Sequence, residues 1–141
     1  TNGCLSICLQ GLYMPIKSIQ RGASFDICYW KEDKGECPFE DFFQDLKENG
    51  HPDYVQILRL IKRSAEQGPP RNIEMSRALV GRNAEGLFEF KAGAIRVIWF
   101  YERSKIIICT HGFLKKGRKT PASEIELAQK TRSKYYAEQN D

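Results

Sequence analysis

The chain has 141 residues and a formal net charge of +4. This length fits one domain with a sizeable core but not two, and the composition is that of an ordinary soluble globular protein. No apolar run approaches the roughly 20 residues that a membrane-spanning helix needs. The five cysteines are an odd number without metal-site spacing, and they predict reduced thiols in a cytoplasmic protein instead of a disulfide framework.

The N-terminal part of the chain predicts an extension followed by a strand. Residues 1–13 lack a positively charged leader region, and we expect them to be a disordered or vector-derived extension. Residues 14–141 then form the single domain. Phe25–Lys31 is rich in β-branched and aromatic side chains and lies between a glycine and a charged loop. This segment predicts the first strand.

Two helices are expected next, joined as an αα-hairpin. The first begins at Pro38, a residue favoured at the start of a helix, and ends at Asn49-Gly50. The second runs from Pro52 to Gln67. The aromatic and apolar side chains expected to pack in the core are Phe39, Phe42, Phe43 and Leu46 on the first helix, and Val55, Leu58, Ile61 and Ala65 on the second.

Residues 86–120 carry the clearest pattern in the chain, three consecutive antiparallel strands and a basic tail. Leu87–Lys91 alternates between apolar and charged side chains. Ala94–Glu102 is apolar on both faces apart from Arg96, and therefore predicts an inner strand that is covered on both sides. Lys105–His111 predicts the third strand. The preceding connector, residues 71–85, is unassigned, but its apolar side chains are expected to dock on the sheet: Met75, Leu79 and Val80.

A last helix is expected to begin with Thr120 as N-cap and Pro121 as its first residue, and to fray after Tyr136. The order is therefore strand, helix, helix, three strands and helix. This order predicts an α+β domain: a small, mostly antiparallel twisted sheet with an N-terminal αα-hairpin on one face and a C-terminal helix.

Positive charge is concentrated in residues 86–120. Eight basic and two acidic residues give this stretch a net charge of +6, so the rest of the chain carries −2. The basic residues are Lys91, Arg96, Arg103, Lys105, Lys115, Lys116, Arg118 and Lys119. We expect one convergent patch without an internal acidic counterweight, suited to an anionic partner or an acidic segment.

Four sequence pieces in this region resemble a known family. They are Gly-Leu-Phe-Glu-Phe-Lys (86–91), Ile-Arg-Val-Ile-Trp-Phe (95–100), His-Gly-Phe-Leu-Lys-Lys (111–116) and Thr-Pro-Ala-Ser-Glu-Ile-Glu-Leu-Ala (120–128). Together they resemble the HigB-like, phage-derived branch of the RelE/ParE toxin superfamily. The resemblance covers Phe25 to about Tyr136 and implies a RelE-like fold. It also implies the toxin of a type II toxin–antitoxin system, an endoribonuclease or mRNA interferase that cleaves mRNA on the ribosome.

The resemblance also implies which partners the protein has. A cognate helix-turn-helix antitoxin is expected to silence the toxin, the ribosome and mRNA are its targets, and DNA is reached only through the antitoxin. No membrane partner is expected. No Cys/His/Asp cluster supports a metal and no glycine-rich loop supports a nucleotide, so no cofactor is predicted.

Metal-free RNA cleavage needs a base, an acid and cations that stabilise the charged phosphorane. Arg96 matches the arginine that the family keeps on its middle strand, and an arginine inside an apolar strand must find an anion. That anion is either a bound phosphate or an internal partner such as Glu89. Lys91 falls where the family places a lysine or arginine, and the alternative is a solvated surface charge.

The remaining candidates follow the third strand. His111 stands where the apolar strand ends, and its pKa range suits acid or base work, although a lone histidine is more often structural. Lys115 and Lys116 match the family's paired lysines and are expected to contact phosphate. RNA binding is also assigned to Arg118, Lys119, Arg103 and Lys105. No glutamate–histidine pair of a self-sufficient ribonuclease is visible in the sequence.

Two other functions on the same fold remain open at this point. One is a non-enzymatic, gyrase-inhibiting ParE-type toxin. The other is an RNA-binding regulatory module without toxicity. A gyrase binder does not need a convergent phosphate site, so the basic residues around Arg96 favour the endoribonuclease.

Overall fold

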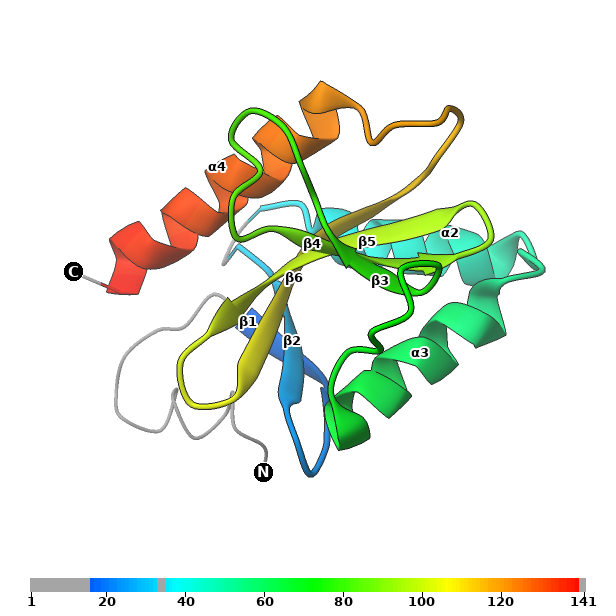
Figure 1. Cartoon of the computed structure of the whole chain (residues 1–141), viewed down its shortest axis with the longest axis horizontal. Coiled ribbons are helices and arrows are strands. Elements are labelled where there is room, and N and C mark those ends of the chain that lie inside the picture. Colours follow the sequence, from blue (N-terminus) through cyan, green and yellow to red (C-terminus); the bar gives the residue numbers. More distant parts are fainter. Residues whose placement is uncertain (1–15, 33–34, 140–141) are drawn as a thin grey trace.

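The computed structural model describes residues 16–32 and 35–139. In chain order these form β1 (Ile16–Arg21), β2 (Asp26–Trp30), α2 (Pro38–Glu48), α3 (Tyr54–Gln67), β3 (Ser76–Ala78), β4 (Phe88–Ala92), β5 (Ile95–Glu102), β6 (Ile106–Leu114) and α4 (Ala122–Gln139) (Figure 1). The prediction for residues 1–13 lies outside the described residues. Within the described ranges, no helix combines the length and apolarity that crossing a bilayer requires.

The strands form a six-stranded sheet in the order β1-β2-β6-β5-β4-β3. The α+β class is confirmed, but the antiparallel prediction is only partly matched because β2 and β6 run parallel. The prediction lacked two strands: β1, which pairs with β2, and β3, which pairs with β4. The inner position of β5 between β6 and β4 is confirmed, and its residues 95–100 are all buried.

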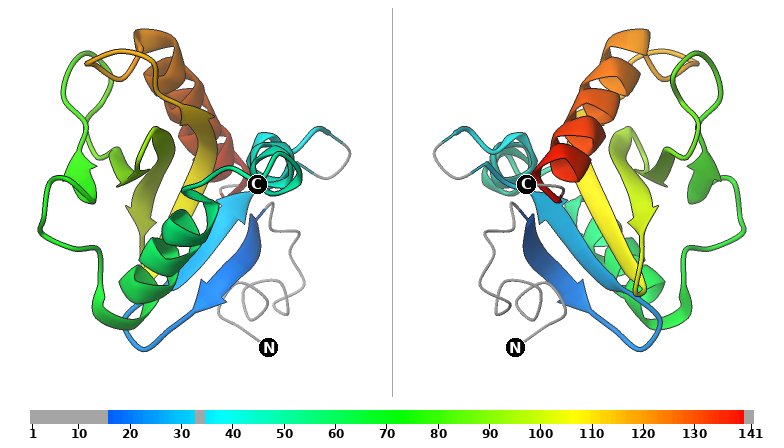
Figure 2. Two further views of the ribbon diagram at one scale, coloured as in Figure 1. Left: turned by 90° about the vertical axis from the view of Figure 1, so that its right-hand side faces the viewer. Right: turned by 90° about the vertical axis from the view of Figure 1, so that its left-hand side faces the viewer.

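Helices cover both faces of the twisted sheet (Figure 2). On one face, α2 and α3 pack over Val97 and Trp99 of β5, and on the other, α4 packs over Ile98 and Phe100. The predicted hairpin is only partly matched. The two helices are consecutive and share a face, yet α2 packs mainly on β6 and α3 mainly on β4 and β1. Each helix is therefore held chiefly by the sheet.

Some predicted core positions are wrong. Val55 and Leu58 of α3 are exposed, as is Val80 after β3. The buried stripe of α3 consists of Ile57, Leu60, Ile61, Ser64 and Ala65. These positions follow the same helical period but face the sheet from a slightly different side of the helix, so the predicted stripe was rotated around the helix axis.

A bulge in β6 decides which side chains lie on which face. Ile98 pairs with His111 while Trp99 pairs with Cys109, so Thr110 is an extra residue in β6. One extra residue reverses the alternation beyond it. Cys109 therefore points to the α2–α3 face, and His111 points to the α4 face. The strand also continues to Leu114, beyond the predicted end at His111.

The cysteines differ from the prediction at one position. Cys28 is disulfide-bonded, so the expectation that all thiols are reduced is wrong there. Cys37 and Cys109 are free and buried. Spacing along the sequence could not show this, because a disulfide depends on which cysteines the fold brings into contact.

Candidate phosphate-binding site

Arg96 lies on the inner strand β5, on the face that α4 covers, and is 9% exposed. Its Nη1 donates to the carbonyl oxygens of Gly93 at 2.6 Å and Ile95 at 2.9 Å. Its Nε is buried without a hydrogen-bond partner. Burial lowers the pKa of the guanidinium, Glu89 opposes this effect and Arg77 adds to it. The guanidinium is therefore fixed by the backbone and retains an unused donor.

Glu89 is fully buried on β4, but it is not the direct partner of Arg96. Arg77 on β3 donates from Nε to Glu89 Oε2 at 2.8 Å, and the Thr120 hydroxyl donates to Oε1 at 3.0 Å. Within the described part of the chain no carboxylate lies within ion-pair distance of Arg96. Of the two anions predicted for Arg96, the internal ion pair with Glu89 is absent from the structure.

Two predictions are corrected by this arrangement. Glu89 is an acidic counterweight inside the basic region, where none was expected. Thr120 does not cap α4 with its side chain, because its hydroxyl is bonded to Glu89. Instead the Pro121 carbonyl accepts the backbone N–H of Glu124 at 3.0 Å, so Pro121 precedes the helix.

Lys115 joins Arg96 from the end of β6. Its backbone N–H donates to the Ala94 carbonyl at 2.8 Å, which holds the start of the loop after β6 beside the β4–β5 turn. Burial lowers the pKa of the Lys115 ammonium, and Arg96 lowers it further. Arg77 and Lys91 act in the same direction, while Glu89 opposes them. These five residues (Arg77, Glu89, Lys91, Arg96 and Lys115) are called the Arg96 cluster below, and they hold four cations around one carboxylate.

His111 belongs to a different part of the same face. Its Nε2 lies 3.0 Å from Glu124 Oε1, and its Nδ1 lies 3.1 Å from the Thr110 hydroxyl. A carboxylate only accepts hydrogen bonds, so Nε2 carries the ring proton. Burial lowers the pKa of His111 and so favours the neutral imidazole, although Glu124 opposes this effect. A glutamate–histidine pair therefore exists, where the sequence showed none.

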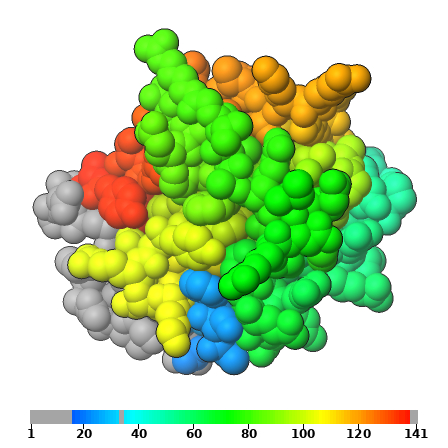
Figure 3. All heavy atoms as spheres, in the orientation of Figure 1, coloured from blue at the N-terminus to red at the C-terminus, as the bar shows by residue number. Residues whose placement is uncertain are grey.

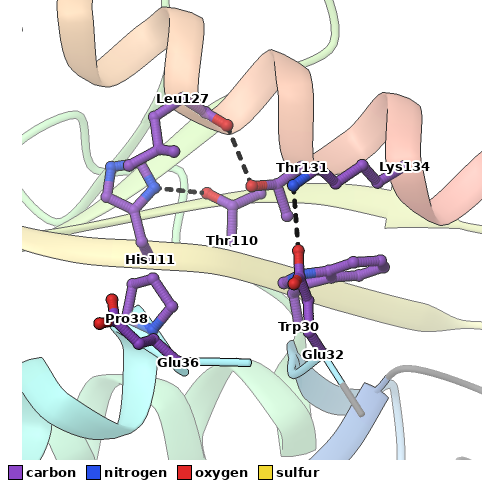
Figure 4. Close-up of a pocket in the computed structure, with 9 residues that line it drawn as sticks. All are labelled: Trp30, Glu32, Glu36, Pro38, Thr110, His111, Leu127, Thr131 and Lys134. Carbon is purple, nitrogen blue, oxygen red and sulfur yellow. Dashed lines mark hydrogen bonds and ion pairs between the residues drawn. The ribbon is translucent and has the colours of Figure 1, made fainter. Parts of the chain in front are cut away.

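A pocket of about 370 Å³ lies beside His111, between β6, α4 and the segment around α2 (Figure 4). Lys134 of α4 and Glu32 form an ion pair of 3.0 Å across it. The pocket is lined by Trp30, Glu32, Glu36, Pro38, Thr110, His111, Leu127, Thr131 and Lys134. Its two glutamates and one lysine make it a poorer match for phosphate than the Arg96 cluster.

The other predicted RNA-binding residues fall into two groups, and only one of them lies near Arg96. Arg103 and Lys105 lie in the turn between β5 and β6, at the far end of β5. Arg103 is the seventh residue after Arg96, which corresponds to roughly 23 Å along an extended chain. Lys116, Arg118 and Lys119 are exposed in the loop between β6 and α4, next to Lys115. The expected single patch is therefore divided between two ends of the sheet.

Sequence reasoning missed Arg77 and Glu124. Arg77 lies in a strand of three residues that has no local pattern, and pairing with β4 alone brings it to Glu89. Glu124 reaches His111 because α4 crosses back over β6. Among the described residues no group of three His, Cys, Asp or Glu side chains is placed to bind a metal ion.

The structure thus defines an α+β domain with a preorganised cationic cluster at one end of its sheet. Residues 41–133, about two thirds of the chain, match the family model of the phage-derived protein Gp49-like (DUF891). The chain belongs to this family, which is associated with toxin–antitoxin systems. The matched region runs from α2 into α4 and includes all members of the Arg96 cluster, as well as His111 and Glu124. Comparison with curated proteins finds no match.

Proposed function

We propose that this chain is the toxin of a type II toxin–antitoxin pair and a ribosome-dependent mRNA endoribonuclease of the HigB-like branch of the RelE/ParE superfamily. Membership of a toxin–antitoxin-associated family supports the toxin. The observation that carries the enzymatic part is Arg96, a guanidinium held on an inner strand with its Nε unpartnered. Because this donor is already in position before the reaction starts, it can stabilise the transition state without the cost of reorienting during the reaction.

In the proposed reaction the 2′-hydroxyl of one nucleotide loses its proton to water and attacks the adjacent phosphate. The bond to the 5′-oxygen of the next nucleotide breaks, which leaves a 2′,3′-cyclic phosphate. Arg96 stabilises the negative charge that develops on the phosphorane. Lys115 donates a proton to the leaving 5′-oxygen, a role for which its lowered pKa suits it. Lys116, Arg118 and Lys119 contact the flanking backbone, and the ribosome supplies the in-line geometry of the mRNA.

His111 has a positioning role in this proposal. The ring is 3% exposed, and both of its nitrogens already face a partner. It joins β6 to the first turn of α4 through Glu124, and so fixes the basic loop that precedes the helix. The earlier alternative, in which His111 transfers the proton, is less consistent with a buried and fully engaged imidazole.

The proposal also includes the partners. A helix-turn-helix antitoxin would cover the Arg96 cluster and the basic loop, and the active toxin would work on ribosomes in the cytoplasm. An acidic or phosphate-like surface on the antitoxin would compete with mRNA for the same cations. Co-purification with the product of the neighbouring gene tests this part.

Induced expression with mapping of mRNA 5′ ends tests the function. We expect growth arrest and new 5′ ends inside translated reading frames, and neither with Arg96→Ala at equal protein level. DNA breaks without RNA cuts would instead support a gyrase poison. Unimpaired growth with intact mRNA at high expression would support the regulatory module and contradict the proposal.

A further inference from the structure

A second cationic site lies on the opposite side of the β4 edge from the Arg96 cluster. It is a groove of about 280 Å³ between α3 and the sheet, lined by Gln56, Arg59, Leu60, Arg63, Met75 and Lys91. Three of these six side chains are cations and none is acidic. In the space-filling view, α3 and the connector that follows it form adjoining parts of this face (Figure 3).

The packing of α3 explains why the arginines are available. The helix buries its stripe against the sheet, which leaves Arg59 and Arg63 exposed on its flank. They are four residues apart, so their side chains project side by side along one edge of the helix. In the described part of the chain neither arginine takes part in an ion pair.

Lys91 connects this groove to the Arg96 cluster. It pairs with Arg96 across β4 and β5, and it adds to the positive field at Lys115. β3 begins at Ser76, and the Lys91 backbone N–H donates to the Met75 carbonyl at 2.8 Å, so the connector lies against the edge of β4 beside Lys91. The Lys91 ammonium donates to the Ile73 carbonyl at 3.2 Å and reaches the groove. Lys91 therefore joins the cations of the Arg96 cluster to those of α3. No acidic side chain lines the groove itself, and Glu74, whose charge raises the pKa of Arg96, lies in the connector beside it.

We propose that this groove binds the phosphate backbone of an RNA strand and continues the path of the RNA that the Arg96 cluster holds. The inference rests on the proposed function for its choice of RNA. Arginine forks bind two phosphate oxygens at once, and the Gln56 amide adds a neutral donor. The apolar floor of Leu60 and Met75 excludes water from one side, which strengthens the attraction to phosphate.

An acidic protein segment is the competing occupant. RNA is favoured because the cations of the groove lie next to the Arg96 cluster, where the scissile phosphate is placed. One RNA strand could therefore contact the groove and the Arg96 cluster together. A peptide bound only here would leave the cations of the Arg96 cluster unmatched. The experiment below separates the two.

The test uses the full chain and a fluorescent, 2′-O-methylated single-stranded RNA, which cannot be cleaved through its 2′-oxygen. Binding is measured by anisotropy at several salt concentrations. Each phosphate contact on a single strand contributes about −0.7 to the slope of log K against log salt. The double variant Arg59→Ala/Arg63→Ala should reduce the magnitude of the slope by about 1.4, since two contacts are lost.

Lys62→Ala is the matched control. Lys62 is exposed on the same helix and adjacent to Arg63, but it does not line the groove. It should leave the slope unchanged, and all variants should keep the wild-type melting temperature because the residues are exposed. Equal slope changes for Arg59→Ala/Arg63→Ala and Lys62→Ala, or no RNA binding by the wild type, would overturn the inference.

Further outcomes separate this inference from the proposed function. If the arginine variants lose antitoxin binding but bind RNA normally, an acidic segment occupies the groove and the inference is wrong. If mRNA is cleaved in cells but the arginine variants bind RNA as the wild type does, the proposed function is supported and the proposed role of the groove is wrong. If the arginine variants weaken RNA binding but the wild type cleaves no mRNA, RNA binding by the groove is supported and the proposed endoribonuclease activity is wrong.

Discussion

Replacing Arg96 with methionine should remove activity and lower stability only modestly. Two hydrogen bonds from Nη1, to Gly93 and Ile95, favour the arginine by about 1.5–3 kcal/mol each, as bonds from a charged donor. Two effects disfavour the arginine in the folded protein. The unpartnered Nε costs about 1–3 kcal/mol or more, and the positive charges of Arg77 and Lys115 repel the guanidinium.

The two bonds together favour the arginine by about 3–6 kcal/mol, and the unpartnered Nε with the like charges offsets a large part of this. Arg96→Met should therefore lower the free energy of unfolding by about 1–2 kcal/mol, or the melting temperature by about 4–8 °C. Cleavage, in contrast, should fall by about 10²–10³ under single-turnover conditions, the typical loss for one preorganised donor. Arg96→Lys should recover little of this, because an ammonium cannot present two parallel donors to phosphate.

The assay pairs urea unfolding with single-turnover cleavage of mRNA on programmed ribosomes, and ribosome binding should stay within a few-fold of wild type. A well-folded methionine variant that cleaves at near wild-type rate would show that Arg96 is not at the reacting phosphate. A loss of about 3 kcal/mol or more would show that Arg96 is mainly structural.

Three further predictions concern neighbouring residues. Glu89→Gln weakens the bonded pair with Arg77 and should lower the free energy of unfolding by about 1–3 kcal/mol in urea titrations; an unchanged midpoint would mean that the carboxylate's charge contributes nothing. Arg103→Ala should weaken ribosome binding slightly, most at low salt, and leave saturated cleavage unchanged, because an exposed turn charge is screened; a large fall in saturated rate would place this turn near the chemistry. The pKa of His111 lies below its ordinary value of 6.5 because of burial, opposed by Glu124, so stability is full above that pH. As pH falls from about 6.5 through the lowered pKa the unfolded chain takes up a proton first, and stability is lost. His111→Gln should flatten this part of the urea-derived pH profile, and a slope equal to that of the wild type would refute the assignment.

Much of the fold was predictable because local chemistry and tertiary position agree. The apolar run of β5 can only be an inner strand, and Pro38 marks the start of α2 as expected. The strands β1 and β3 were not predicted, and both lie at the edges of the sheet. A three-residue strand such as β3 has no period to detect, and its pairing partner alone makes it a strand.

The site was predicted in part for a similar reason. Arg96 stands out because a charge in an apolar strand contradicts its surroundings. Arg77 and Glu124 do not, since each is an ordinary polar residue until pairing or helix crossing brings it to a buried partner. The bulge at Thr110 has no signal in the sequence, yet it decides which face His111 occupies. Charge counting along the chain also could not show that Arg103 and Arg96 lie at opposite ends of one strand.

The proposed activity can be measured as mRNA cleavage in a purified translation system with defined ribosomes and one message. Added wild-type protein should produce new 5′ ends within the reading frame, detected by primer extension, only when ribosomes occupy the message, and Arg96→Ala should produce none. Intact mRNA after prolonged incubation with folded wild-type protein on translating ribosomes would contradict the proposed activity. Equal cleavage by a well-folded Arg96→Ala would contradict the role of Arg96.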